Sequence, residues 1–286
     1  MAANIIDGKA LAHKLRETIT EDVSQLRQDG VIPHLTVIIA GDDPASKSYV
    51  RGKEKATQQT GISFDVIDMP AAISEKELLD SIRELNHDKS VHGILVQLPL
   101  PEHIDEQNVI QTIHPDKDVD GFHPVNIGKL MSGQATFLPC TPYGIMTMLE
   151  AYNISVKGKH AVVIGRSRIV GRPVGQLLLN QDATVTYCHS KTHQLTAYAA
   201  SADILITAVG KANMINSEAI KEGAVIIDVG MNRLDDGSLT GDVDFSSAAE
   251  KASYITPVPK GVGPMTITML LKNTVQAAKG LSYFAG

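Results

Sequence analysis

The chain has 286 residues, of which 43% are hydrophobic and 20% charged, so its composition excludes an intrinsically disordered or collagen-like protein. Its net charge of −6, without a basic block, argues against a nucleic-acid partner. Two cysteines are too few for a disulfide framework, and we find neither a signal peptide nor the roughly 20 consecutive apolar residues of a membrane span. We therefore expect a cytoplasmic protein of about two domains.

The first half of the chain alternates helical and strand-like segments. Hydrophobic periodicity predicts helices over 11–26, 46–60 and 74–87. Asp7 precedes the first helix as a possible cap, and Gly61 ends the second. Ser74 and Glu77 can form a capping box at the third. Apolar runs predict strands over 35–40, 62–67 and 92–98. Such an alternation indicates a parallel sheet covered on both faces.

The stretch 113–142 interrupts this pattern, because Pro, Gly and Asp are frequent in it and its periodicity is weak. We interpret it as the crossover between domains. A second alternation follows, with strands predicted over 160–165, 183–188, 203–209 and 224–230. After a Pro- and Gly-rich loop, a helix is predicted from about 266 to 279. The predicted fold class is α/β, with two α/β domains and a cleft between them.

A glycine-rich turn follows the first strand of the second half. Gly165 ends this strand, and Gly171 opens the next helix. A glycine at a strand end lets the backbone approach a phosphate, and the helix start offers free N–H groups. Ser167 stands where the dinucleotide motif has its second glycine. Such a junction alone is more often ordinary packing, but its place in a βαβ unit with further glycines favours a nucleotide site.

The residues that follow the predicted strand 183–188 distinguish between NAD and NADP as the cofactor. NAD-binding folds usually carry an acidic residue there, which binds the ribose 2′-hydroxyl. Here the strand is followed by Ser190 and Lys191, with no acid, and Arg166 and Arg168 lie in the first turn. Positive charge and a hydroxyl suit a 2′-phosphate, so we predict NADP rather than NAD, although a solvated loop with incidental charge is the alternative.

Tyr49 and Lys53 lie four residues apart and therefore share a helix face. A ring beside an amine suits a flat heterocyclic substrate, although such pairs are usually surface pairs. Gln97 is a polar residue at the end of an apolar strand, where ligands of parallel sheets bind. A structural glutamine that bonds the neighbouring backbone remains equally plausible at this stage.

Three acids between 116 and 120 resemble the start of a calcium loop. The pattern requires Glu where Ile127 stands, and Pro124 interrupts it, so calcium is excluded. We predict no metal site and expect the acids to bind a polar ligand, with Asp120 beside Gly121 as the best candidate.

Six motifs, spread in order over essentially the whole chain, resemble a known family. They are YVRGK at 49–53, VQLPLP at 96–101, KDVDG at 117–121, PCTP at 139–142, GRS with GRP at 165–173, and PVP with GPMT at 257–266. The family is that of the bifunctional methylenetetrahydrofolate dehydrogenase/methenyltetrahydrofolate cyclohydrolases. The resemblance implies a folate-binding catalytic domain over 1–138, completed by the C-terminal helix 266–286, and a Rossmann-like NADP-binding domain over 139–265. It also implies a homodimer in one-carbon metabolism and purine biosynthesis.

The resemblance further implies roles for individual residues. Lys53 would be the catalytic lysine, Gln97 its partner, Asp120 a pterin anchor and Tyr49 the stacking ring. The residues expected to touch NADP are Gly165, Arg166, Ser167, Ser190 and Met231. Those expected to line the folate are Pro259, Gly261 and Gly263. Lys260 departs from the family, which commonly has Gly there; a Cβ at this position demands a negative φ or strain.

The expected chemistry is oxidation of methylenetetrahydrofolate by NADP to methenyltetrahydrofolate, followed by hydrolysis to formyltetrahydrofolate. The first step needs orientation, and the second needs proton transfer, for which Lys53 is the candidate. Two alternatives remain at this stage. One is another NADP-dependent dehydrogenase on the same architecture, of the amino-acid or shikimate type, and the other is a nucleotide-binding regulatory module without turnover.

Overall fold

The computed structural model of the chain describes residues 3–280, which divide into two compact units. The six-stranded unit contains the described residues through His13 and Thr141–Thr266. The three-stranded unit contains Lys14–Cys140 and the described residues from Ile267 onward. Of the helix expected over 266–286, residues 281–286 lie outside the described part. The predicted α/β class with parallel sheets is confirmed.

The three-stranded unit is built on a parallel sheet in the order β3-β2-β4. Its strands are β2 (His34–Ala40), β3 (Ser63–Met69) and β4 (Gly93–Val96). In the register, Leu35 of β2 lies opposite Phe64 of β3 and Gly93 of β4. The central strand β2 is buried beyond its first residue because both of its edges and both of its faces are covered.

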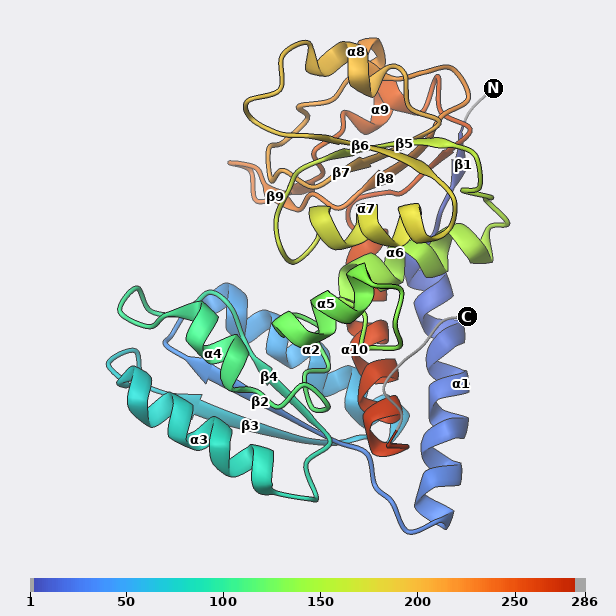
Figure 1. Ribbon diagram of the computed structural model, residues 1–286. Helices are drawn as coiled ribbons and strands as arrows, with labels where there is room; N and C mark the ends of the chain where they lie inside the picture. Colours follow the sequence, from blue (N-terminus) through green and yellow to red (C-terminus); the bar gives the residue numbers. More distant parts are fainter. Residues whose placement is uncertain (1–2, 281–286) are drawn as a thin grey trace. The chain divides into compact units, whose positions relative to one another are not determined.

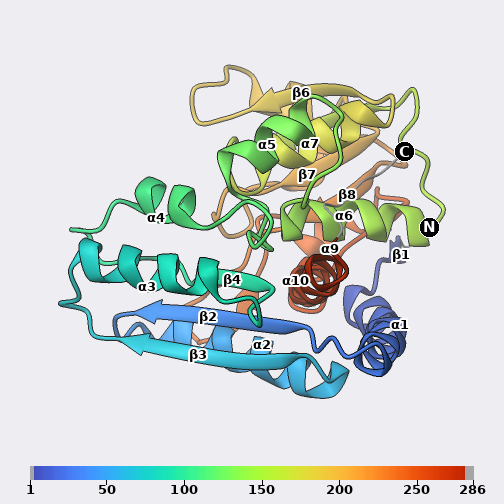
Figure 2. The same cartoon turned by 60° about the horizontal axis from the view of Figure 1, so that its bottom comes forward.

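Helices cover both faces of this sheet. Figure 2 shows α3 on one face and α2 on the other. Ile38, Leu78 and Val109 belong to one core cluster, which packs α3 and α4 against β2. The bounds of the helices are α2 (Pro44–Thr60), α3 (Glu75–His87) and α4 (Glu106–Thr112).

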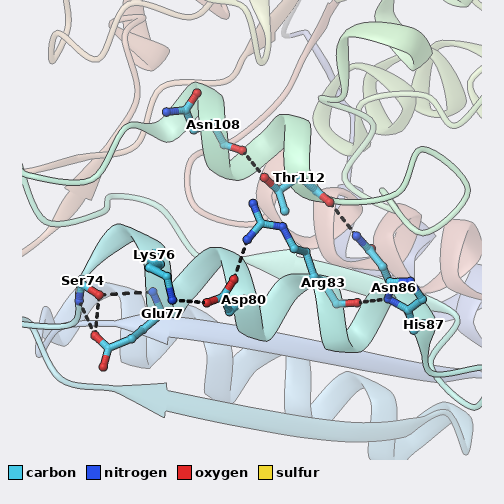
Figure 3. Close-up of polar contacts among 9 residues, drawn as sticks. All are labelled: Ser74, Lys76, Glu77, Asp80, Arg83, Asn86, His87, Asn108 and Thr112. Carbon is cyan, nitrogen blue, oxygen red and sulfur yellow. Dashed lines mark hydrogen bonds and ion pairs between the residues drawn. The ribbon is translucent and has the colours of Figure 1, made fainter.

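Capping residues mark the ends of these helices: polar side chains at their starts and a glycine at the end of α2. Ser74 and Glu77 form the predicted capping box: Glu77 N–H donates to Ser74 Oγ at 3.2 Å, and Ser74 N–H donates to Glu77 Oε2 at 3.1 Å (Figure 3). Asp43 caps α2 by accepting from Ser46 N–H at 2.7 Å. Gly61 ends α2 with φ +77°, a left-handed conformation in which a Cβ would be strained.

The six-stranded unit is a parallel sheet in the order β1-β11-β8-β7-β5-β6. Its strands are β1 (Asn4–Ile5), β5 (His160–Ile164), β6 (Thr184–Cys188), β7 (Ile204–Thr207), β8 (Val225–Asp228) and β11 (Tyr254–Ile255). The start of the chain joins this unit, not the three-stranded one, because β1 pairs with β11. An N-cap then opens α1 (Gly8–Gln28), in which Ala10 N–H donates to Asp7 at 2.9 Å, as predicted.

Figure 1 shows helices on both sides of this second sheet, with α8 and α9 on one side and α6 and α7 on the other. Their bounds are α6 (Cys140–Ala151), α7 (Gly171–Asn180), α8 (Leu195–Ala199) and α9 (Phe245–Ala248). A 3-10 turn spans Ser217–Ala219, and β9 (Asn232–Arg233) and β10 (Leu239–Thr240) form a small antiparallel hairpin.

The structure contains a helix that the sequence analysis did not predict, and its last helix begins earlier than expected. The irregular stretch 113–142 contains α5 (Pro124–Met131), because Pro124 begins this helix with His123 as its cap. The last helix, α10 (Val262–Ala278), begins inside the expected Pro- and Gly-rich loop. Pro264 is tolerated there since residues of a first turn have no intrahelical partner for their N–H groups. No helix within residues 3–280 has the length and apolarity needed to cross a bilayer.

Candidate active site

Helix α2 holds a lysine inside the three-stranded unit. The side chain of Lys53 is buried, with only 9% of the residue exposed. Its Nζ donates a hydrogen bond of 2.8 Å to Oε1 of Gln97. The predicted partnership of these two residues is therefore present as a direct contact.

Gln97 follows β4, at the carboxyl edge of the three-stranded sheet. Its backbone N–H donates to the carbonyl of Ile38 at 2.9 Å, which continues the sheet by one more residue. Its side-chain Nε2 donates to the carbonyl of Leu98 at 2.7 Å. Because the nitrogen of the amide is bound to Leu98, its oxygen faces Lys53. The glutamine thus bonds the neighbouring backbone and presents an acceptor at the same time.

The electrostatics of Lys53 are dominated by its burial. Desolvation lowers the pKa of the Lys53 ammonium, while the charges of Asp120 and Cys140 act in the opposite direction. Burial also raises the pKa of the Asp120 carboxyl, against the attraction of Lys53. It raises the pKa of the Cys140 thiol well above its ordinary value. The site therefore favours a neutral amine more than water does.

The glycine that follows Asp120 lets the chain pack closely against residues 138–139. Gly121 has φ +76°, and a Cβ there would lie 2.6 Å from the backbone between Leu138 and Pro139. Asp118, by contrast, is structural: it is 2% exposed and accepts from the N–H groups of Phe122 and His123. Of the neighbouring acids, Asp120 is the one that shares its electrostatic environment with Lys53.

Tyr49 lies on α2 one turn before Lys53, as the spacing predicts. The residue is 46% exposed, and partial burial raises the pKa of its hydroxyl. The structure thus presents an aromatic face on the same helix as the buried amine.

The six-stranded unit carries the predicted phosphate turn. Gly165 directly follows β5 and has φ +122°, and a Cβ there would overlap the carbonyl of Ala208. A Cβ on Gly171 would overlap the carbonyl of Gly165. The hydroxyl of Ser167 accepts from the N–H groups of Val170 and Gly171, each at 3.2 Å. This tight turn before a helix N-terminus fits the requirements of a dinucleotide phosphate site.

The other residues predicted to touch NADP lie at the same edge of the sheet. Arg166 follows β5, Ser190 follows β6, and Met231 follows β8. All three are exposed, and Met231 is 44% exposed. Since parallel strands share one carboxyl edge, the fold brings these residues to one side of the unit.

The segment predicted to line the folate contains Pro259, Lys260 and Gly261 in the loop before α10, and Gly263 in the first turn of α10. Lys260 has φ +87°. Of the two outcomes predicted for a Cβ at this position, a negative φ or a strained backbone, the structure therefore shows the strained backbone. Gly261 lies where a Cβ would meet the carbonyl of Pro257. These four residues belong to the six-stranded unit.

Two buried carboxylates at the carboxyl edge of the six-stranded sheet were missed by the sequence analysis. They belong to Asp228, at the end of β8, and Asp242, which follows β10. An acid inside the apolar strand 224–230 is the same kind of signal that singled out Gln97, and it could have drawn attention to Asp228.

Comparison with known proteins decides the family. Residues 6–120 match the tetrahydrofolate dehydrogenase/cyclohydrolase catalytic-domain model, and residues 139–282 match the NAD(P)-binding-domain model of the same family. The chain belongs to the tetrahydrofolate dehydrogenase/cyclohydrolase family. The expected family, fold class and NADP-dependent bifunctional enzyme are confirmed.

Relatives of this tetrahydrofolate dehydrogenase/cyclohydrolase align over nearly their whole length. The chain is 62% identical to the bifunctional protein FolD of Oceanobacillus iheyensis over 98% of each chain, and 59% identical to that of Bacillus subtilis. The crystal structure of the FolD enzyme of Campylobacter jejuni superimposes with a TM-score of 0.97 at 51% identity, covering 98% of this chain and 99% of that one.

Two further structures bear on the cofactor and on the alternative reading. A Trypanosoma brucei methylenetetrahydrofolate dehydrogenase-cyclohydrolase, complexed with NADP and an inhibitor, superimposes with a TM-score of 0.94 at 40% identity over 98% of both chains. A shikimate dehydrogenase of Thermus thermophilus covers 87% of this chain with a TM-score of only 0.52 at 14% identity, a likeness of fold alone. The shikimate-type alternative is therefore not favoured.

Proposed function

We propose that the three-stranded unit holds the folate and that Lys53 transfers the proton during hydrolysis of methenyltetrahydrofolate. The observation that carries this proposal is the hydrogen bond of 2.8 Å that the buried amine of Lys53 donates to Gln97. A buried amine with a neutral partner is the arrangement that a lysine base requires.

Hydrolysis adds water to the carbon that joins two folate nitrogens. A proton must leave the water, and one must reach the ring nitrogen whose bond to carbon breaks. A lysine at its ordinary pKa, near 10.4, is a poor base at neutral pH. Burial lowers the pKa of Lys53, and Gln97 orients the amine without the charge by which a carboxylate would restore the ammonium.

The dehydrogenase step, unlike hydrolysis, needs no proton transfer by a side chain of the protein. NADP, when bound, accepts the hydride from the methylene carbon, and the adjacent nitrogens stabilise the resulting cation. The task of the chain is to orient the folate. We assign the exposed ring of Tyr49 to stacking on the pterin, and the carboxyl of Asp120 to accepting hydrogen bonds from it.

We assign the cofactor to the carboxyl edge of the six-stranded sheet. Gly165 and Ser167 would face the pyrophosphate, where a Cβ-free backbone and a helix N-terminus are available. Arg166 and Ser190 would bind the 2′-phosphate, since β6 is followed by no acid. Met231 would contact the cofactor from the loop after β8.

We assign a second folate contact to Pro259 and Gly261, in the loop before α10, and to Gly263, in the first turn of that helix. A Cβ on Gly261 would meet the carbonyl of Pro257, so a glycine lets the loop pack closely there. Lys260 adds an exposed cation to this loop.

We further propose a homodimer that acts in the cytoplasm and has no nucleic-acid partner. The family supports the dimer, and the net charge of −6 supports the absence of nucleic-acid binding.

The test is a coupled spectrophotometric assay with methylenetetrahydrofolate and NADP. NADPH formation reports the dehydrogenase, and the subsequent decay of methenyltetrahydrofolate reports the cyclohydrolase. The proposal expects both signals, and expects Lys53→Met to lose the second. Normal hydrolysis by the Lys53→Met variant would refute the role given to Lys53.

A further inference from the structure

The carboxyl edge of the six-stranded sheet contains two buried aspartates whose charges are met by backbone donors. Asp228 is 3% exposed and Asp242 is fully buried. Together their carboxylates accept hydrogen bonds from six backbone N–H groups and two side chains. Burying a carboxylate costs free energy unless such donors compensate it. Two carboxylates buried side by side with this many donors therefore indicate a specific structural role.

The carboxylate of Asp242 organises the loop that follows β7. Its Oδ2 accepts from Val209 N–H at 2.7 Å and from Gly210 N–H at 3.2 Å. Its Oδ1 accepts from Lys211 N–H at 2.8 Å. Three consecutive amides that converge in this way form a nest, a concavity that commonly binds an anion. Here the anion is a side chain of the protein itself, so the loop is held in one shape before any ligand arrives.

The same carboxylates hold the loop that follows β8. Asn232 Nδ2 donates to Asp242 Oδ1 at 3.0 Å, and Gly230 N–H donates to Asp228 Oδ1 at 2.9 Å. Met231 lies between these two anchored residues. Its position in the loop is therefore fixed from both sides.

Asp228 in turn supports Asp242. It accepts from the backbone N–H of Asp242 at 3.0 Å and of Val243 at 2.9 Å. A Cβ on Gly241 would overlap the carboxyl of Asp228, and a Cβ on Gly230 would overlap that of Asp242. The two glycines thus provide the space that the two carboxylates occupy.

The loop after β7 also abuts the phosphate turn. A Cβ on Gly165 would overlap the carbonyl of Ala208, the residue directly before the nest. A change in the shape of the nest would therefore reach the backbone at Gly165, in the turn to which the cofactor phosphate is assigned.

We propose that Asp242 is a positioning residue for the dinucleotide: its carboxylate fills the amide nest at 209–211 and ties it to the Met231 loop, which fixes the cofactor-facing edge of the sheet. Asp228 holds the backbone of Asp242 in place. This inference rests on the proposed assignment of NADP to this edge.

The test is Asp242→Asn in the full-length enzyme. The amide replaces an acceptor with an NH2 group that faces N–H donors, so the nest must open. We expect the KM for NADP and the dissociation constant in an NADP titration to rise about tenfold, with kcat changed less than threefold. Hydrolysis of methenyltetrahydrofolate supplied directly, which consumes no NADP, should stay within twofold of the wild-type rate. The matched control is Asp244→Asn, two residues further on, which removes a charge but keeps a side-chain oxygen that can cap α9, and it should leave the NADP KM within twofold.

An unchanged NADP KM in Asp242→Asn would overturn the inference, and so would a parallel loss of NADP affinity and hydrolysis, since that would indicate a general structural role. If Asp242→Asn does not fold, Asn232→Ala replaces it. This variant removes one tie to the carboxylate and should raise the NADP KM about threefold; an unchanged value would again overturn the inference. Failure of the assignment itself would appear separately, as an Arg166→Ala variant that binds NADP with wild-type affinity.

Discussion

The ammonium of Lys53 donates to Oε1 of Gln97 at 2.8 Å, and the nitrogen of the same glutamine amide donates to the carbonyl of Leu98 at 2.7 Å. The second bond prevents the amide from presenting its nitrogen to the amine. The partner of Lys53 is thus an acceptor without charge. Because the Gln97 amide adds no full negative charge beside the amine, this contact does not cancel the lowering of the Lys53 pKa by burial.

Replacement of Lys53 by Met should abolish the cyclohydrolase activity. The side chain keeps its approximate volume but loses the only amine of this pair, so we expect a loss of about 100-fold or more in the hydrolysis rate, as for removal of a general acid–base group. Methenyl decay after rapid mixing measures it. Lys55→Met, an exposed lysine on the same helix, is the matched control and should retain the wild-type rate. Equal rates in the two variants would contradict the role of Lys53.

Replacement of Gln97 by Glu should move the pH profile of hydrolysis to higher pH. A carboxylate in contact with the amine stabilises the ammonium and raises its pKa by roughly 1–3 units. The neutral amine then forms only at higher pH, so the rise of kcat/KM should shift upward by at least about one pH unit. Gln97→Met, which adds no charge, should lower the rate without such a shift. Superimposable profiles for wild type and Gln97→Glu would show that Lys53 is not the base.

Replacement of Asp120 by Ala should weaken folate binding by about tenfold or more, because a partly buried hydrogen-bond acceptor for the pterin is lost. NADP affinity should remain nearly unchanged, since the cofactor is assigned to the other unit. Separate titrations with each ligand measure the two effects. Asp116→Ala, at an exposed neighbouring acid, should change neither. An equal loss of both affinities in Asp120→Ala would argue against a pterin anchor.

The titration of the Asp228 carboxyl should lower the free energy of unfolding of the enzyme as the pH rises. Burial raises the pKa of its carboxyl from 3.8 to about 6. Between these values the unfolded chain has released a proton that the folded chain retains, so the contribution of this group is fully present below pH 3.8 and is lost as the pH rises through 6. From pH 5 to pH 8 the loss amounts to roughly 1 kcal/mol. Urea unfolding at both pH values measures the free energy of unfolding of the wild type and of Asp228→Asn. The difference between the two proteins should be smaller at pH 8 than at pH 5 by about 1 kcal/mol. A constant or widening gap would be inconsistent with the raised pKa.

Replacement of Lys260 by Gly should stabilise the protein slightly. Lys260 has φ +87°, where a side chain costs roughly 1 kcal/mol, although the greater freedom of an unfolded glycine offsets part of the gain. We expect a net gain of about 0.5 kcal/mol in the free energy of unfolding. Lys89→Gly, at an exposed turn lysine whose φ is not left-handed, should destabilise instead. A loss of stability in Lys260→Gly would mean that the lysine side chain makes compensating contacts.

Local rules of sequence predicted most of the secondary structure. The capping box at Ser74 and the C-cap at Gly61 depend on residues within a single turn, so their residue types suffice to identify them. Strand β1 could not be found in this way. It has only two residues, and its pairing with β11, some 250 residues further on, exists only in the folded unit.

Residues of the candidate site could be predicted where a polar residue interrupts an apolar stretch of the sequence. Gln97 stood out as a polar residue in an apolar run, and its contact with Lys53 followed from the fold. Asp242 carries no such signal, because it lies in a polar loop and its burial results from the convergence of three segments. The raised pKa of Cys140 likewise depends on tertiary burial.

Neither compact unit is a continuous piece of the chain. The polypeptide passes from one to the other after His13, after Cys140 and again after Thr266. A gene fragment that ends at residue 140 would therefore lack the helical segment from Ile267 onward, and one that begins at 141 would lack β1. A cut at either boundary would therefore leave both units incomplete, and we expect variants specialised for one activity to arise by substitutions within an intact chain.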